Sequence, residues 1–263
     1  MLRIITIIWL LLIANTAWAN PIDDQCPQHV LLGAPVSKIK QNSQYICKIN
    51  YAIHYRYDTK TAEYVVEHVT QEGTTGTFKR KDDFRPDPAI PTQHTATLKD
   101  YAGNPYDRGH LAPAGNNTQS EQVMSESFFL SNMVPQVPNH NRGIWKQLET
   151  FVREWVVDNG MDLYVISGTV YNKEFKTIGE GRVGVPDQLW KVIIDRKEGK
   201  AIAFIFPNTA LPVADLPKYA TTVAAVEKLT GINFMPKLPK EKAKIEKTAP
   251  DLSKWPKLNN TSN

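Results

Sequence analysis

Three short segments of the chain carry the side chains with which it could do chemistry. Asp107-Arg108-Gly109-His110 lies in an irregular stretch with few apolar residues, Leu130–Gln136 contains Asn132, and Asn141 precedes a strongly amphipathic segment. A histidine titrates near pH ~6.5, so it can take a proton from water at neutral pH. Guanidinium groups bind phosphate oxygens through paired hydrogen bonds, and an amide oxygen suits a hard cation such as Mg²⁺. This combination favours phosphodiester hydrolysis over acyl transfer.

Other hydrolytic chemistries have no motif in this sequence. It contains no Gly-x-Ser-x-Gly elbow, no His-Glu-x-x-His pair and no Gly-rich phosphate loop. The three segments also lack a compact cluster of Asp and Glu, so a metal bound there would keep most of its waters and nearly its full double charge. That charge would oppose the negative charge that develops when a phosphodiester is cleaved.

In these residues the sequence resembles the DNA/RNA non-specific endonucleases, the ββα-metal nucleases. Their signature Asp-Arg-Gly-His is met by residues 107–110, and their Leu-Ser-Asn…Pro-Gln segment by residues 130–136. In their Asn-x-x-x-Trp-x-x-x-Glu run, Asn141, Trp145 and Glu149 are in register. The resemblance extends from about residue 51 to residue 236 and so covers most of the chain.

The resemblance implies a role for each matched side chain. His110 is expected to be the general base that activates the attacking water, and Asn141 the only direct protein ligand of Mg²⁺. Glu149 is expected to hydrogen-bond the water molecules on that metal. Asn132 is expected to be an active-site amide, and Arg108 is expected to lie near the phosphate.

The family also uses an arginine from the loop upstream of the motif to bind the transition state. Arg80 is the best match here, although Lys79, Lys81 and Arg85 compete for the same place in the alignment. One departure concerns Gly115, since the family commonly has alanine five positions after the motif histidine. We expect this change to loosen the backbone without affecting the chemistry.

Two matched residues leave alternatives open. Asp107 either braces its loop or takes part directly, and Asn141 could cap the following helix as well as bind metal. Asn141 and Glu149 are eight residues apart, which on a regular helix is about 80° of rotation and about 12 Å of rise. They would therefore not touch one ion directly, whereas a carboxylate acting through metal-bound water is feasible. His140 invites comparison with His-Asn-His nucleases, but the spacing favours Asn141 and makes His140 a bystander.

Alternating and helical patterns predict an α+β fold. The resemblance implies a central antiparallel sheet flanked by helices, with a ββα-metal motif at the site. A long loop over residues 71–91 and a helix from about Gly143 to Asp158 flank the chemistry. The other expected elements are a hairpin of strands 51–57 and 62–70, a strand at 163–168, a hairpin of strands 189–195 and 201–206, and a helix over 217–230.

The two ends of the chain differ from its body. Residues 1–19 have one cation, an apolar run of ten residues and a small-x-small triplet, which predicts a signal peptide and export to a periplasm or outside the cell. Residues 20–236 are expected to form the nuclease domain and 237–263 a basic, flexible tail. The chain of 263 residues carries a net charge of +4, concentrated in that tail. In an exported chain, Cys26 and Cys47 are expected to form a disulfide.

We therefore expect an exported, Mg²⁺-dependent, sugar-non-specific endonuclease, with Mn²⁺ as a substitute metal. Its substrates would be DNA and RNA, its products 5′-phosphorylated oligonucleotides, and after signal cleavage it would have no membrane partner. The sequence does not indicate an oligomeric state. Two other interpretations stay open: an exported nucleic-acid-binding protein without turnover, and a phosphodiesterase of small phosphate diesters.

Overall fold

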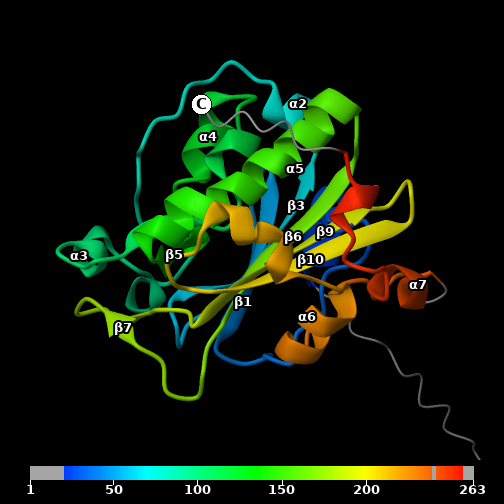
Figure 1. Ribbon diagram of the computed structural model, residues 1–263. Coiled ribbons are helices and arrows are strands. Elements are labelled where there is room, and N and C mark those ends of the chain that lie inside the picture. Colours follow the sequence, from blue (N-terminus) through cyan, green and yellow to red (C-terminus); the bar gives the residue numbers. More distant parts are fainter. Residues whose placement is uncertain (1–20, 239–240, 257–263) are drawn as a thin grey trace, which may run out of the picture.

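The computed structural model describes residues 21–238 and 241–256, and a seven-stranded antiparallel sheet lies at its centre (Figure 1). The strands are, in spatial order, β1 (Ser43–Cys47), β2 (Tyr51–Arg56), β3 (Thr61–Val69), β6 (Leu163–Val170), β9 (Gln188–Asp195), β10 (Lys200–Pro207) and β11 (Ala220–Thr221). Every neighbouring pair is antiparallel. The predicted sheet is therefore confirmed, while the expected signal peptide lies outside the described residues.

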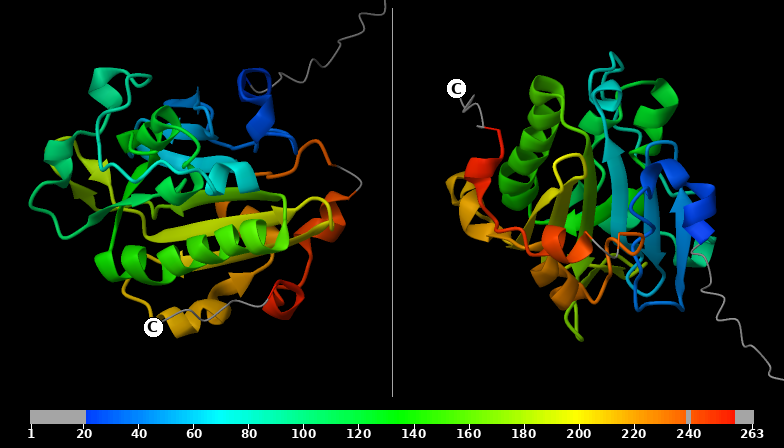
Figure 2. Two further views of the ribbon diagram at one scale, coloured as in Figure 1. Left: turned by 90° about the horizontal axis from the view of Figure 1, so that it is seen from above. Right: turned by 90° about the vertical axis from the view of Figure 1, so that its right-hand side faces the viewer.

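Helices cover both faces of this sheet, which makes a three-layer fold (Figure 2). They are α1 (Pro21–Gln25), α2 (Gln71–Thr74), α3 (Leu98–Tyr101), α4 (Glu121–Glu126), α5 (Lys146–Asn159), α6 (Val223–Thr230) and α7 (Lys242–Glu246). The long helix α5 packs on one face, and α6 and α7 pack on the other. None of the helices in the described part of the chain has the length and apolarity needed to cross a membrane.

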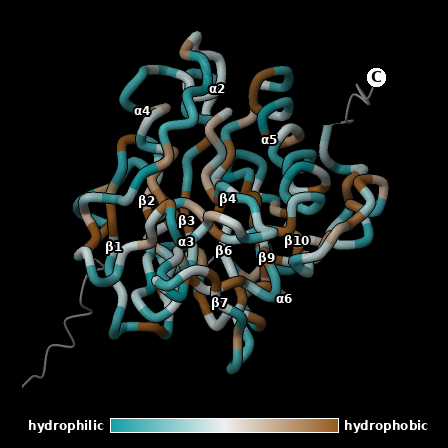
Figure 3. The backbone as a smooth tube through the Cα atoms, turned by 90° about the vertical axis from the view of Figure 1, so that its left-hand side faces the viewer, coloured by the Kyte–Doolittle hydropathy of each residue, from teal (hydrophilic) through white to brown (hydrophobic). Residues whose placement is uncertain are grey.

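The alternation of side chains along each strand divides the interior into two cores. In β9, Leu189 and Ile193 point into the core beneath α5, whereas Trp190 and Val192 point into the core against α6. Successive side chains of a strand point to opposite faces, so a strand covered on both sides must be apolar almost throughout. Figure 3 shows this hydrophobic concentration in the strands, with more hydrophilic segments around α2 and α4.

Helix α5 forms because its apolar residues recur at helical spacing. Leu148, Phe151, Val152, Trp155 and Val156 are buried on the sheet. The helix ends at Gly160, which takes the left-handed conformation (φ 61°) that favours glycine.

A separate two-stranded ribbon positions the functional motif beside α5. Strand β4 (Asp107–His110) pairs with β5 (Met133–Gln136), so that Gly109 faces Val134 and His110 faces Met133. A Cβ atom on Gly109 would lie only about 2.3 Å from the buried Gln136 side chain. The close approach of Gln136 therefore explains why the motif has glycine at this position. A second short ribbon joins β7 (Thr177–Ile178) to β8 (Val183–Gly184).

Two expectations about the C-terminal part were wrong. The helix expected over 217–230 begins only at Val223, because residues 213–219 form a 3₁₀ segment and 220–221 add strand β11. The tail expected to be flexible from 237 onward is packed where it is described: Ile245 and Trp255 are 3% and 4% exposed. The Trp255 ring lies 4.6 Å from that of Trp155, so apolar burial outweighs the basic composition of this segment.

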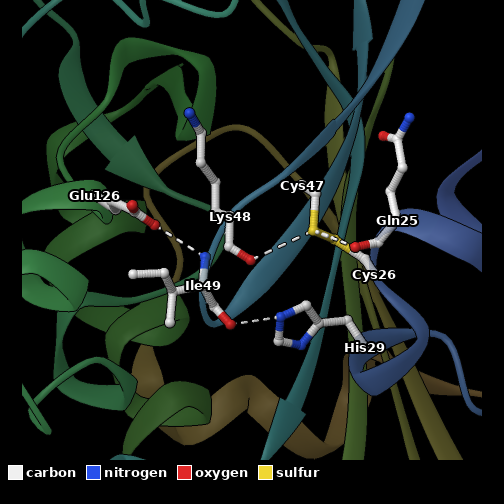
Figure 4. Close-up of a disulfide and its surroundings, with 7 residues drawn as sticks. All are labelled: Gln25, Cys26, His29, Cys47, Lys48, Ile49 and Glu126. Carbon is white, nitrogen blue, oxygen red and sulfur yellow. Dashed lines mark hydrogen bonds between the residues drawn. A yellow bond between two sulfur atoms is a disulfide. The ribbon is translucent and has the colours of Figure 1, made fainter.

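The N-terminal segment is joined to the sheet by the Cys26–Cys47 disulfide, as predicted (Figure 4). Nearby, the His29 ring bonds to the carbonyl oxygen of Ile49 at 2.8 Å, and the Ile49 amide donates to Glu126 at 2.9 Å. The bridge therefore holds the start of the described chain against β1 and the turn that follows it.

Candidate active site

A cleft of about 560 Å³ opens between the β4 ribbon, the loop after α2 and the start of α5. Five cationic side chains and three carboxylates line it. The lining residues are Phe78, Arg80, Asp82, Phe84, Asp107, Arg108, His110, Pro113, Ala114, Gly115, Thr118, Met124, Asn141, Arg142, Lys146, Glu149 and Arg153. Five of the six residues expected at the site are among them.

His110 lies at the end of β4 and is fixed by its neighbours on two sides. Its carbonyl oxygen accepts a hydrogen bond from the Trp145 indole at 3.1 Å, which ties the motif to the start of α5. Its ring meets Phe128 edge-on at 5.0 Å, and only 8% of the residue is exposed. The imidazole is therefore held in one orientation at the wall of the cleft.

The environment of His110 keeps its ring neutral. Burial, together with the positive charges of Arg80 and Arg108, lowers the pKa of His110 to about 3. Its Nε2 atom has no hydrogen-bond partner among the described residues. A neutral imidazole with an uncommitted nitrogen at pH 7 is able to accept a proton from a water molecule.

Asp107 organises the opposite wall of the cleft. Its carboxylate accepts hydrogen bonds from Asn141 Nδ2 at 2.9 Å and from Arg142 at 2.8 Å and 2.6 Å. Burial acts to raise the pKa of Asp107, but the bonds from Arg142 and Asn141 outweigh it and lower this pKa. The bond to Asn141 commits the amide nitrogen and leaves the amide oxygen for another partner. The structure thus gives Asp107 the bracing role.

Asn141 does not sit at the start of a regular helix, as the spacing argument assumed. It lies in a π-helical turn, His140–Trp145, and α5 begins only at Lys146. Gly143 has non-helical dihedral angles (φ −102°, ψ −110°), so the chain is kinked between Asn141 and Glu149. The rotation and rise calculated for one continuous helix therefore do not apply. Asn141 makes no capping hydrogen bond, because its side chain turns to Asp107 instead.

Glu149 lies one turn along α5 from Trp145 and reaches the cleft. Its buried Oε1 atom has no hydrogen-bond partner in the described part of the chain. Burial raises the pKa of Glu149, and the positive charges of Lys191 and Arg153 oppose this rise. The carboxylate is therefore a free acceptor whose ionisation depends on nearby cations.

Two arginines stack on a pair of aromatic rings beside His110. The Arg108 guanidinium lies 4.1 Å from the centre of the Phe84 ring, and that of Arg80 lies 5.0 Å from Phe128. These contacts hold both cations at the cleft, where they can meet an anionic substrate.

The other basic residues of the loop point elsewhere. Arg85 bonds to Asp83 and to the carbonyl of Ser125, and Lys81 pairs with Glu121. Neither they nor Lys79 line the cleft. Of the loop cations considered from the sequence, the structure brings Arg80 to the cleft.

Asn132 is the expected site residue that does not line the cleft. It is fully buried, and its side chain bonds to both the amide and the carbonyl of Ala112 at 2.9 Å and 2.8 Å. It also donates to the carbonyl of Ser127 at 2.9 Å. Asn132 thus supports the backbone just after His110. His140 is likewise buried, with its ring near those of Trp145 and Phe206.

Sequence reasoning missed Arg153 and gave too little weight to Lys146. Helical spacing could have found both, because Lys146, Glu149 and Arg153 follow one another at intervals of three and four on one face of α5. A Cβ atom on Gly115 would lie 3.0 Å from the Arg153 guanidinium. The departure from alanine at position 115 therefore makes room for this arginine.

The donor set fits a cation that keeps most of its water. In residues 21–238 and 241–256 there is no cluster of three or more His, Cys, Asp or Glu side chains that could hold a metal. The cleft instead offers the amide of Asn141 and the carboxylate of Glu149. A hard ion such as Mg²⁺, which is reluctant to lose water, suits so sparse a set.

A ribbon of two strands followed by a helix, with a histidine and an asparagine lining the same arginine-rich cleft, defines the ββα class of phosphodiester-cleaving enzymes. The family model described as DNA/RNA non-specific endonuclease matches residues 32–241. The chain belongs to this family.

Individual relatives agree with this assignment. The chain is 36% identical to the mitochondrial nuclease EXOG of Xenopus laevis over 74% of its own length and 59% of that protein, and 31% identical to human mitochondrial endonuclease G over 72% and 68%. The chain thus spans less than two thirds of the EXOG relatives. A chain in a crystal structure of the EndoG/EndoGI complex matches with a TM-score of 0.73 and 27% identity, over 82% of this chain and 93% of that one.

The expected location, exported to a periplasm or secreted, was wrong. The comparisons contradict it, because the EXOG and endonuclease G relatives are mitochondrial nucleases. The apolar leader that suggested export lies outside the described residues.

Proposed function

We propose that the chain is a Mg²⁺-dependent, sugar-non-specific endonuclease that hydrolyses DNA and RNA to 5′-phosphorylated oligonucleotides, with residues 20–236 as its nuclease domain. The observation that carries this proposal is the neutral imidazole of His110 at the wall of a cleft that also contains Asn141, Glu149 and several arginines. Family membership supports it, since the family is one of non-specific endonucleases.

In this proposal His110 is the general base. Its imidazole takes a proton from a water molecule, the water oxygen attacks the phosphorus, and the bond from phosphorus to the 3′-oxygen breaks. The 3′-oxygen takes a proton from solvent, and the phosphate stays on the 5′ side. Arg80 and Arg108 bind the non-bridging phosphate oxygens. Asn141 and, through water, Glu149 would hold Mg²⁺, whose chemical contribution is positive charge near the leaving oxygen.

The charges of the cleft support action on both DNA and RNA. Its cations are placed to contact phosphate groups, which both polymers share, and phosphate contacts carry no sequence information. Phosphate-dominated binding also predicts that cleavage weakens as salt is raised.

A plasmid-nicking assay with purified protein tests the proposal. We expect nicking with Mg²⁺ or Mn²⁺, loss of nicking with a chelator, and comparable cleavage of RNA. Persistence of full activity in the chelator, or of wild-type activity in His110→Ala, would refute the mechanism. Binding of DNA without any cleavage across a metal series would favour the non-enzymatic alternative. Faster hydrolysis of a small diester than of DNA would favour the phosphodiesterase alternative.

A further inference from the structure

A second cavity, of about 310 Å³, lies between the segment around His29, the turn after β1, the end of β3 and helix α2. Asn116 lies in its wall and accepts a hydrogen bond at 3.5 Å from Arg153, which lines the cleft. The two cavities differ in charge. Five cationic side chains line the cleft, whereas none of the described residues around the second cavity is a lysine or an arginine, and two of them are Glu67 and Glu72. A phosphate group therefore has no cationic partner here, and the chemistry of the cleft does not explain this cavity.

Three side chains around this cavity have a buried polar atom without a hydrogen-bond partner in the described part of the chain. The atoms are Glu67 Oε1, His29 Nδ1 and Gln119 Oε1. Glu67 is 3% exposed and His29 is 4% exposed. Buried polar groups are normally hydrogen-bonded, because an unpaired one is costly. Three unpaired groups around one cavity therefore point to an occupant that supplies their partners.

The unpaired nitrogen of His29 is a hydrogen-bond acceptor. The other ring nitrogen, Nε2, lies 2.8 Å from the carbonyl oxygen of Ile49 (Figure 4). A carbonyl oxygen only accepts, so Nε2 carries the proton of the neutral ring and Nδ1 is left with a lone pair. Burial lowers the pKa of His29, which keeps the ring neutral at pH 7.

The Glu67 carboxylate is a second acceptor, and its charge is not fully compensated. Its other oxygen, Oε2, accepts from Asn116 Nδ2 at 2.9 Å. Burial raises the pKa of Glu67 to about 7, and the positive charges of Lys191 and Arg153 counteract this rise only in part. With the amide oxygen of Gln119, the cavity thus presents three acceptors, one of which gains from a nearby positive charge.

We propose that this cavity binds the primary ammonium group of a small organic cation. An alkylammonium group has three N–H donors and no acceptor, which matches the unpaired atoms of Glu67, His29 and Gln119. Its charge makes the hydrogen bond to Glu67 a strong one. A directly bound metal ion fits less well, because residues 21–238 and 241–256 contain no group of three or more His, Cys, Asp or Glu that could hold one. The inference goes beyond the proposed function and does not depend on it.

The test uses n-butylammonium chloride in a buffer free of amines, with 1-butanol as the uncharged counterpart. Methyl NMR follows Ile49 and Val69, which line the cavity. We expect saturable shifts with a Kd of about 1 mM, nuclear Overhauser contacts between the butyl chain and these methyl groups, and no saturation by 1-butanol. Glu67→Gln should weaken binding by about tenfold, because it removes the charged acceptor. The matched control is Glu63→Gln, a buried carboxylate of the same strand outside the cavity, which should leave the Kd unchanged.

Absence of saturation in the wild-type protein would overturn the inference, as would an equal Kd in folded Glu67→Gln or equal binding of 1-butanol. If Glu67→Gln does not fold, Gln119→Met replaces it, since this side chain is only half-buried; we expect a Kd about fivefold higher, and an unchanged Kd would overturn the inference. Displacement of butylammonium by Mg²⁺ at equal concentration would assign the cavity to a metal ion instead. Absence of nicking by the wild-type protein would refute the proposed function alone, because these titrations do not depend on activity.

Discussion

Two buried histidines, His54 on the α6 face of the central sheet and His110 at the cleft, differ in how their ring nitrogens are partnered. On the face toward α6, His54 has both ring nitrogens partnered, Nδ1 with Glu63 at 2.6 Å and Nε2 with Ser43 at 3.0 Å. On the face toward α5 and the cleft, His110 Nε2 and Glu149 Oε1 have no hydrogen-bond partner among residues 21–238 and 241–256.

This difference separates structural from chemical use of the same residue types. Buried polar groups are normally satisfied, because an unpaired one costs about 1–3 kcal/mol. His110 bears such a cost at the wall of the cleft, where we propose that its ring acts on water. Both ring nitrogens of His54 already have hydrogen-bond partners, whereas Nε2 of His110 has none among the described residues.

Replacing each of these two histidines by alanine gives the largest difference in nicking rate that we expect. We expect His110→Ala to lower the rate of Mg²⁺-dependent nicking by about a thousandfold, since it removes the general base. We expect His54→Ala to leave the nicking rate per folded molecule unchanged and to reduce the free energy of unfolding by about 2 kcal/mol, because Glu63 loses its partner. Nicking assays and urea denaturation of both variants measure these changes. The opposite pattern would refute the distinction between the faces.

Removing the disulfide tests whether the α6 face of the sheet affects only the stability of the fold and not the nicking rate. We expect the double substitution Cys26→Ser and Cys47→Ser to lower the free energy of unfolding by about 3 kcal/mol, because the unfolded chain is no longer constrained. The nicking rate should stay unchanged in conditions where the variant remains folded, since the bridge contacts no residue of the cleft. Denaturation curves and nicking assays check the two parts, and a slower folded variant would show that the faces are coupled.

The pH dependence of stability tests whether His140 is a buried neutral residue that takes no part in the chemistry of the cleft. Burial lowers the pKa of His140 to about 4, below the ordinary value near ~6.5 that applies to the unfolded chain. Between these values the unfolded state binds more protons, so stability falls as pH is lowered from about 6.5 toward 4. We expect His140→Phe to reduce this slope by roughly 1.4 kcal/mol per pH unit while activity at pH 7 persists. Urea denaturation at several pH values measures the slope, and an unchanged slope would show that His140 titrates normally.

The smallest effect concerns the carboxylate that orients Asn141. Asp107→Asn keeps the shape of the side chain but removes the charge that accepts from Asn141 and Arg142. We expect the Mg²⁺ concentration for half-maximal nicking to rise by about tenfold, as is typical when a group supporting a metal ligand is lost. A metal titration measures this change. Asp82→Asn, another cleft carboxylate, is the control, and an equal effect in both would point to general electrostatics rather than to orientation of Asn141.

The sequence was most informative where local pattern and tertiary structure agree. Alternating apolar residues located the strands of both hairpins, and the spacing of Leu148, Phe151 and Trp155 located most of α5. The kink at Gly143 could not be predicted, because it depends on contacts between Asn141, Asp107 and the neighbouring ribbon rather than on helix propensity.

The buried charges were also beyond the reach of sequence reasoning. Lys191 is one polar position in a hydrophobic strand, and only the fold shows that it is 1% exposed with its ammonium group over the Trp145 ring. Likewise, the basic composition of the C-terminal segment suggested solvation, whereas isolated residues such as Ile245 and Trp255 determine where it packs. The average composition of a segment therefore does not predict whether it packs on the fold, because a few apolar side chains determine its burial.

The indoles of Trp155 and Trp255, whose ring centres are 4.6 Å apart at an interplanar angle of 34°, provide a spectroscopic signal for the C-terminal segment. The Trp155 indole donates to the carbonyl oxygen of Pro256 at 3.2 Å, and Lys200 donates to that of Lys254 at 3.2 Å, so the segment around Trp255 lies strapped to the back of α5. Two indoles this close produce a coupled signal in near-ultraviolet circular dichroism. Detachment of the strap, by proteolysis or by a fused tag, would therefore register spectroscopically while the cleft on the other side of the helix is assayed independently.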